Sequence, residues 1–328
     1  MAALASGYHG PPELTLVRAF TEWTADLPMI ALVVVLGGCY LLLARRARRG
    51  GVRWETGRTV AFCGLGLGFL VIATMSWVGA YQNVLFYARA VQTVLLVLVV
   101  PLFLAMGRPL TLLGAAFPGA GRRAEAAVRS RAAVAVTFPA VTTLALVGVP
   151  MTMYFTSWYT ATFHSGTIRE LTYLALMVPG YVFFWTLLRV DPVPKRYPYG
   201  VSMWITAAEV VGDAFFGIAV LADTNLIAGP HYRAVGYPWG PSLASSQVIG
   251  GGVLWILGDL VGLPFLAAQL IQMMREDQAE AAAIDAELDA GEAARAASAD
   301  GTADAEPADG NRPWWETDPR FTERFRQT

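Results

Sequence analysis

The sequence is poor in charged residues, cysteine and histidine. Charged side chains make up 15% of the 328 residues, against about 25% in a soluble domain. The two cysteines both fall in apolar segments, which excludes a disulfide framework. An HExxH motif, a nucleotide-binding glycine loop and a hydrolase nucleophile motif are also missing. These absences predict that the protein is not an enzyme.

Long apolar runs dominate what is present. Hydrophobic residues make up 55% of the chain and the mean hydropathy is +0.46. A transmembrane helix needs about 20 apolar residues, and none of the runs alternates as the strands of a membrane barrel do. We therefore predict an all-α, polytopic membrane protein with about seven transmembrane helices, at 27–44, 59–79, 87–106, 132–155, 170–188, 200–221 and 247–272.

Basic residues concentrate in alternate connections between these spans. The first connection contains six arginines between 45 and 58, the third contains Arg108 and the arginines of 122–131, and the fifth contains Arg189, Lys195 and Arg196. Connections rich in Lys and Arg stay in the cytoplasm. We expect a multi-pass protein of the plasma membrane, with its N-terminus outside and its C-terminus inside. A basic face for nucleic acid is not indicated.

This topology divides the chain into three parts. Residues 1–26 form an extracytoplasmic segment that lacks the pattern of a cleaved signal, and 27–274 form the seven-helix domain. Residues 275–328 form a cytoplasmic, acidic and alanine-rich tail that we expect to lose order near 297–311. The tail ends in an aromatic segment with Trp314, Trp315 and Phe321, which could rest on the inner membrane surface or on a partner.

Small residues and prolines within the spans predict how the helices pack. Gly64 with Gly68, and Gly258 with Gly262, have the GxxxG spacing that allows close helix contacts. Four prolines lie within predicted spans and are expected to bend them: Pro101, Pro139, Pro179 and Pro264.

Polar residues inside the spans are the first candidates for function, because a charge in lipid is costly and usually faces the bundle interior. They are Arg89, Gln92, Glu209, Asp213 and Asp259. Arg89 and Asp213 both lie toward the outer side, so we expect them to pair. The pair could be structural, or it could belong to an ion path or a remodelled ligand site.

Sulfur and imidazole ligands near the outer ends are the second candidates, since thioether and imidazole suit Cu(I). These are Met75, Met151, Met153 and His164. Cys39 and Cys63 could form a second Cu(I) pair. Methionine and small buried cysteines also simply fill apolar cores.

Three stretches resemble one protein family. They are residues 76–113, which include QTVLLVLVVPLFLAMGRPLTLL, the FFGIA of 215–219, and SQVIGGGVLWILGDLVGLPFL at 246–266. Together they resemble the CtaG-type cytochrome c oxidase assembly factors over roughly residues 28–290. The resemblance implies a seven-helix plasma-membrane protein that helps to insert copper into the catalytic subunit of a haem–copper oxidase. Its partners would be the lipid bilayer, that subunit and a copper donor on the periplasmic side.

The family's helix-three pattern, H-M-x-Q-H, is altered in this chain. Its positions read Arg89, Ala90, Val91, Gln92 and Thr93, so only the glutamine is kept. The resemblance places further family histidines at Arg169, Tyr173 and Asp213, and an acidic residue at Ser246. Arginine cannot ligate copper because it stays protonated. The resemblance thus implies that the fold is retained and the metal site is changed.

Several functions remain open from the sequence. An oxidase assembly factor could still deliver copper through the methionines, or it could act as a scaffold without metal. A transporter or channel could use the intramembrane charges. A membrane anchor could act through its acidic tail and aromatic end.

Overall fold

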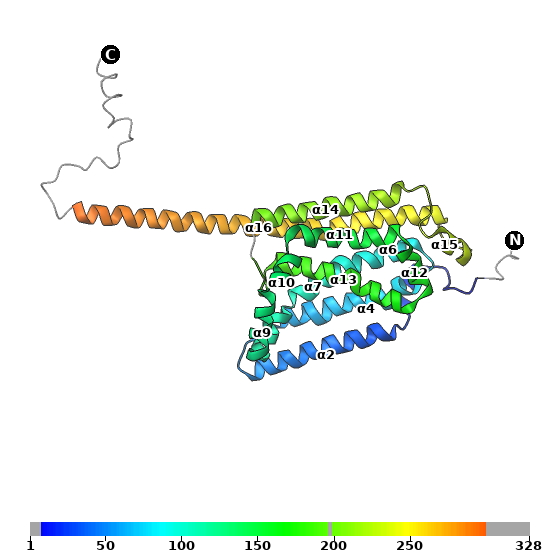
Figure 1. Cartoon of the computed structure of the whole chain (residues 1–328), viewed down its shortest axis with the longest axis horizontal. Coiled ribbons are helices and arrows are strands. Elements are labelled where there is room, and N and C mark those ends of the chain that lie inside the picture. Colours follow the sequence, from blue (N-terminus) through cyan, green and yellow to red (C-terminus); the bar gives the residue numbers. More distant parts are fainter. Residues whose placement is uncertain (1–7, 196–198, 300–328) are drawn as a thin grey trace, which may run out of the picture. The chain divides into compact units, whose positions relative to one another are not determined.

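The computed structural model describes residues 8–195 and 199–299, and these form helices without any strand (Figure 1). Six helical segments are long and apolar enough to cross a membrane, or seven if one sharply bent pair counts as a single span. The predicted all-α membrane fold is confirmed. The spans are Leu27–Arg49, Thr56–Tyr81, Phe86–Ala116, the bent pair Pro139–Phe155 with Ser157–His164, Gly166–Leu188, Gly200–Ala222 and Leu243–Arg275.

Three of these spans are single regular helices, and a fourth is the start of a longer one. They are α2 (Leu27–Arg49), α13 (Gly166–Leu188), α14 (Tyr199–Ala222) and α16 (Leu243–Ala299). The start of α2 shows how the sequence sets a boundary. Asp26 accepts a hydrogen bond from the Met29 N–H at 3.2 Å, a proline occupies the first turn, and arginines fill the last turn before Gly50. The cap and the basic last turn both stabilise the helix dipole.

The second and third spans are interrupted helices. The second comprises α3 (Thr56–Thr59), the π-helical turn η1 (Val60–Gly66), α4 (Leu67–Met75) and α5 (Trp77–Tyr81). The third comprises α6 (Phe86–Val94), the π-helical turn η2 (Leu95–Val99), α7 (Val100–Met106) and α8 (Pro109–Ala116). Pro101 lies in the first turn of α7, directly after η2. A proline has no N–H to donate, and a π-turn shifts the hydrogen-bond register around it.

The fourth span differs from its predicted limits. The predicted helix at 132–155 is split into α10 (Arg131–Val136) and α11 (Pro139–Phe155), so Pro139 begins a helix instead of bending one. Proline is tolerated in the first turn because the N–H there has no partner within the helix. Pro150 is the proline inside α11. After Phe155 the chain turns by 72° into α12 (Ser157–His164).

Three further short helices lie outside the spans. They are α1 (Leu16–Thr21) near the N-terminus, α9 (Pro118–Val128) after the third span, and α15 (Gly229–Val235) between α14 and α16. In Figure 1, α9 and α10 lie at one end of the helical bundle, while α12 and α15 lie at the other.

The end with α9 is where the basic connections meet. The Arg46 side chain, from the first connection, donates through Nε to the carbonyl of Ala116 at 3.0 Å. Asp191, from the fifth connection, accepts the N–H groups of Leu110 and Thr111 at 3.1 and 2.9 Å. The first, third and fifth connections therefore share one end of the bundle.

The opposite end gathers the N-terminal segment and the remaining connections. The Tyr81 hydroxyl donates to the Pro12 carbonyl at 2.7 Å, and His231 lies 2.9 Å from the carbonyl oxygen of Asn83. The arginine asymmetry seen in the sequence thus becomes a difference between the two ends. The basic end facing the cytoplasm remains a prediction.

Glycine permits the closest helix contacts, though at only one of the two predicted motifs. A Cβ at Gly258 would lie 2.7 Å from Asp213 Oδ2, and one at Gly262 would lie 2.9 Å from the Val210 side chain. Gly64 and Gly68, by contrast, face no neighbouring helix within 4 Å, and Gly180 instead contacts the Val97 carbonyl directly. Spacing alone could not separate these glycines, because it does not say which face meets a neighbour.

The chain divides into two compact units, Met1–Ile271 and Gln272–Thr328. The first contains all the helices of the bundle. In the second, α16 continues as a helix to Ala299. The aromatic residues Trp314, Trp315 and Phe321 lie outside the described residues, as does the basic residue Arg196.

The contact at Gly180 makes a prediction about stability. In the Gly180→Ala variant the new methyl group would overlap the Val97 carbonyl, so we expect the free energy of unfolding to fall by about 1–3 kcal/mol. Gly68→Ala is the matched control, because its methyl group meets nothing and alanine favours a helix. Thermal unfolding in detergent measures both. Equal melting temperatures for the two variants would contradict the close packing of α13 on the third span.

Labelling of introduced cysteines tests the orientation. In a chain with Cys39 and Cys63 changed to serine, we expect Thr224→Cys to react with a membrane-impermeant maleimide on intact cells. Ala126→Cys in α9 should react only after lysis, because its end of the bundle carries the basic connections. The reverse pattern would invert the predicted topology.

Candidate functional site

A buried arginine lies at the centre of the polar interior. Arg89, on α6, is 1% exposed. Its Nη1 donates to Gln82 Oε1 at 2.6 Å and to Gln92 Oε1 at 3.3 Å, and its Nη2 donates to Thr162 Oγ1 at 2.9 Å. All three acceptors are neutral, so the guanidinium charge is solvated by dipoles and not by a carboxylate.

The two glutamine amides are held so that their oxygens face Arg89. Gln82 donates through Nε2 to the Gly79 carbonyl at 3.0 Å, and Gln92 donates through Nε2 to the Ala73 carbonyl at 2.8 Å. An amide has one oxygen and one NH₂ group, so fixing the NH₂ on a backbone carbonyl directs the oxygen the other way. Both acceptors are therefore positioned for a cation.

Tyrosine and threonine hydroxyls extend these bonds. The Tyr173 hydroxyl donates to Gln82 Oε1 at 2.8 Å, and Thr93 Oγ1 donates to the Arg89 carbonyl at 2.9 Å. Thr93 Oγ1 also lies 3.1 Å from the Tyr154 hydroxyl. We call this set of side chains the Arg89 network: Gln82, Arg89, Gln92, Thr93, Tyr154, Thr162 and Tyr173.

An aromatic cluster closes the network toward the end of the bundle with α15. The Tyr159 ring lies 5.7 Å from the Arg89 guanidinium carbon, and the Tyr159 and Tyr232 hydroxyls are 2.8 Å apart. Phe163 stacks on the His231 imidazole with ring centres 3.7 Å apart. His231 Nε2 must donate to the Asn83 carbonyl, because that oxygen only accepts. Burial raises the pKa of Tyr232, so its phenol is neutral at physiological pH.

The expected ion pair between Arg89 and Asp213 does not form. Arg89 faces α12 and α13 through Thr162 and the glutamines, whereas the Asp213 carboxylate points at Gly258 on α16. The carboxyl groups of Asp213 and Glu209 are thus directed toward the glycines of α16 and not toward Arg89. The ion pairs of the described residues include Arg58 with Glu55 at 2.9 Å and Arg169 with Glu170 at 3.3 Å.

The acidic residues form a second polar group between α14 and α16. Glu209 is 2% exposed and Asp213 is 9% exposed, and both interact electrostatically with Asp259. The space for them comes from the glycines of α16, since a Cβ at Gly262 would lie 3.2 Å from Glu209 Oε2. Glu209 Oε1 and Asp259 Oδ1 are buried without a hydrogen-bond partner in the described part of the chain.

The sulfur and imidazole candidates lie in different environments. Met75 and Met153 are both buried in the main hydrophobic core, and Met151 packs against it. His164 is exposed at the last residue of α12. Cys39 is exposed and Cys63 is half-buried. The part of the chain that the structure describes contains no group of three or more His, Cys, Asp or Glu side chains able to hold a metal ion. The methionine site remains a prediction.

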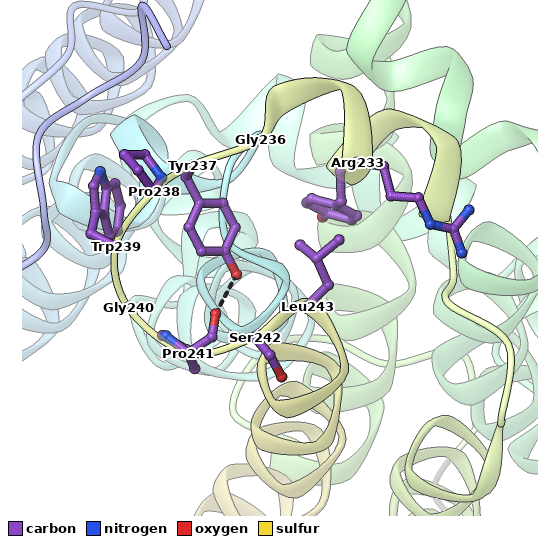
Figure 2. A pocket seen from close by; sticks show the side chains of 10 residues that line it. Arg233, Gly236, Tyr237, Pro238, Trp239, Gly240, Pro241, Ser242 and Leu243 are labelled. Atoms are coloured by element: carbon purple, nitrogen blue, oxygen red, sulfur yellow. Dashed lines mark hydrogen bonds between the residues drawn. The ribbon is translucent and has the colours of Figure 1, made fainter. Parts of the chain in front are cut away.

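The loop after α15 surrounds an open pocket of about 590 Å³ (Figure 2). Figure 2 shows the loop curving from Gly236 past Trp239 to Pro241, with the Tyr237 hydroxyl donating to the Pro241 carbonyl at 2.8 Å. Gly236 and Gly240 have φ values of +56° and +75°, which an L side chain rarely adopts. Trp239 packs edge-on against Tyr81, which fixes the loop on the bundle.

The resemblance places two helix-three histidines and one helix-five histidine of the family at three positions of this chain. These positions come together around Arg89. Arg89, Thr93 and Tyr173 are joined directly or through Gln82 and Gln92. Ser246 instead accepts the Phe86 N–H at 3.2 Å. Sequence reasoning missed Gln82 and Thr162, because they lie in a connection and in the short α12, outside the predicted spans.

Comparisons with known proteins show the family of the chain. The family model for the cytochrome c oxidase caa3 assembly factor (Caa3_CtaG) matches residues 38–276. An uncharacterized protein of Mycobacterium leprae (strain TN) is 30% identical over 291 residues, which cover 86% of this chain and 44% of that protein. An uncharacterized protein of Mycobacterium bovis is 30% identical over 293 residues, with the same coverage of 86% and 44%. No solved structure matches.

The chain spans less than half the length of these curated relatives, and their names assign no activity. The family model, in contrast, covers most of this chain, including all of the Arg89 network. The chain therefore belongs to the caa3-type cytochrome c oxidase assembly factor family.

Proposed function

We propose that this protein supports assembly of a haem–copper oxidase in the plasma membrane as a scaffold, without holding copper at the positions of the Arg89 network. The observation that carries the proposal is the buried guanidinium of Arg89 within a set of neutral acceptors. The partner would be the oxidase catalytic subunit, which meets this protein within the bilayer or at its surface.

The chemistry of the network does not fit Cu(I). A guanidinium has no lone pair to donate and stays protonated, and its positive charge repels a metal cation. Thr93 and Tyr173 offer neutral hydroxyl oxygens, whereas Cu(I) favours thiolate, thioether and imidazole. The Gln82 and Gln92 oxygens, the best remaining donors, are already bound to Arg89.

The network fits a structural role instead. Arg89 joins the connection before α6 and α12 to α6, and the bond from Tyr173 to Gln82 adds α13. Such a set of buried, mutually dependent bonds favours a single arrangement of helices over alternatives. A scaffold that binds a membrane partner needs a fixed surface, which a rigid interior provides.

Copper delivery through the methionines is the second candidate. Met75 and Met153 are buried in the same core, which would suit thioether ligation of a Cu(I) cargo. A charged transport path has less support. The acidic cluster of Glu209, Asp213 and Asp259 and the Arg89 network do not form an ion pair across the bundle.

Cu(I) binding by the purified full chain distinguishes a scaffold without copper from a protein that delivers copper through its methionines. We expect no copper to be retained against a chromophoric Cu(I) chelator under anaerobic conditions, because the network offers no soft ligand. The Met75→Leu/Met153→Leu variant should give the same titration. Retention of one equivalent by the unchanged chain, with loss in this variant, would instead establish copper handling by the methionines.

Complementation of a deletion strain tests the role of Arg89. We expect deletion to lower terminal oxidase activity, and added copper not to restore it. Arg89→Met should complement poorly, since it leaves the Gln92 oxygen without its donor, at a cost of about 1–3 kcal/mol, and leaves the Gln82 oxygen with Tyr173 as its donor in place of two donors. Membrane content and thermal unfolding of the variant would be measured alongside.

Arg58→Met is the matched control for this experiment. It removes an arginine whose partner, Glu55, is 69% exposed, and an ion pair at such a surface position is worth about 0–1 kcal/mol. Full complementation by both variants would contradict the role given to the network. Restoration of the deletion strain by copper alone would favour copper delivery.

A further inference from the structure

A basic cleft lies at the end of the bundle where the first and third connections meet. It shares no residue with the Arg89 network. It has a volume of about 560 Å³ and lies where the end of α2 faces the end of α8 and the start of α9. One wall is basic and the other is small and apolar. The lining residues are Leu42, Arg45, Arg46, Arg49, Gly50, Ala115, Ala116 and Pro118.

The arginines of this cleft are arranged to bind an anion. Arg46 is held in place through Nε on the Ala116 carbonyl at 3.0 Å and by stacking over the Phe117 ring at 4.3 Å. The structure gives its two terminal nitrogens no bond within the described residues. Arg45 and Arg49 likewise form no ion pair or hydrogen bond with another described side chain. Three guanidinium groups therefore face one cleft without a carboxylate.

The start of α9 adds to the same positive potential. This helix of 11 residues begins at Pro118, which lines the cleft, and its N-cap Phe117 provides no side-chain hydrogen bond. The N–H groups of a first helical turn have no partner within the helix and attract anions, phosphate in particular. Pro118 itself has no N–H, so the helix start adds the positive end of its dipole, and the three arginines provide the hydrogen-bond donors.

The surroundings of the cleft distinguish a lipid from a soluble anion. It lies at the end of a span, and Leu42 on its rim is 64% exposed while the preceding Leu41 is 43% exposed. Apolar side chains exposed on a transmembrane helix face acyl chains. A ligand with a phosphate in the cleft and hydrocarbon along α2 matches both parts of this surface.

We propose that this cleft binds the headgroup phosphate of an anionic phospholipid, with its acyl chains lying along α2. The three arginines bind the phosphate oxygens, and the start of α9 adds the positive end of its helix dipole. Leu42 and Leu41 contact the lipid tail. The site would tie the first span to the third connection through a bound lipid, and it does not depend on whether the protein handles copper.

Lipid retention and thermal unfolding of the purified full chain test this proposal. The protein in detergent is titrated with dioleoylphosphatidylglycerol, with dioleoylphosphatidylcholine, and separately with inorganic phosphate. We expect only the phosphatidylglycerol to be retained in native mass spectrometry and to raise the melting temperature. Arg45→Gln/Arg46→Gln/Arg49→Gln should weaken this binding by about 100-fold.

Two further variants control for misfolding and for a general effect of surface charge. Arg45→Gln/Arg49→Gln leaves the bond between Arg46 and Ala116 intact, so it should fold normally and still bind the lipid, about 30-fold more weakly. Arg122→Gln/Arg123→Gln/Arg131→Gln removes the same charge from exposed positions that do not line the cleft, and it should bind as the unchanged chain does.

Three results would overturn the proposal. Equal retention of the two lipids would show that the headgroup charge is not recognised. An equal loss in the control variant would assign the effect to overall surface charge. An equal rise in melting temperature with inorganic phosphate would assign the cleft to a soluble anion.

Discussion

Burying the Arg89 guanidinium without a carboxylate is the constraint on which the rest of the interior depends. A charge taken out of water is tolerated only where dipoles replace its hydration. Here two amide oxygens and one hydroxyl do so, and each comes from a different part of the chain. Two breaks in the helices supply part of this solvation. The turn after α5 presents Gln82, and the 72° bend after α11 brings Thr162 of α12 to the guanidinium.

The bundle keeps its two kinds of buried charge apart. Arg89 is solvated between α6, α12 and α13, while the carboxyl groups of Glu209 and Asp213 lie against the glycines of α16. A direct ion pair would have neutralised both groups. Because they do not pair, each group is stabilised by its own surroundings. Fixed oxygens stabilise the cation, and the residues packed around the acids stabilise the acids. Such groups restrict the helices to one packing.

The chain belongs to the oxidase assembly family, while its Arg89 network differs from the H-M-x-Q-H pattern of the resemblance. Arg89 and Thr93, which the resemblance assigns to helix-three histidines, lie one turn apart on α6, and Tyr173 of α13 reaches the same group of side chains through Gln82. In this chain these positions hold an arginine with neutral acceptors. The basic cleft at the other end adds a surface directed at the membrane itself.

Hydrophobic run length and arginine placement were enough to predict the seven apolar segments and the two unlike ends, because both depend on the bilayer and act on each segment separately. The buried state of Arg89, Gln92, Glu209 and Asp213 also followed from their positions inside apolar runs. Which of them meet did not follow. Arg89 and Asp213 appeared to be partners by depth, yet the rotation of α6 and α14 directs them to different neighbours. The partners Gln82 and Thr162 and the break at Pro139 likewise depend on how the helices pack, since only the packed chain brings residues from separate segments within hydrogen-bonding distance.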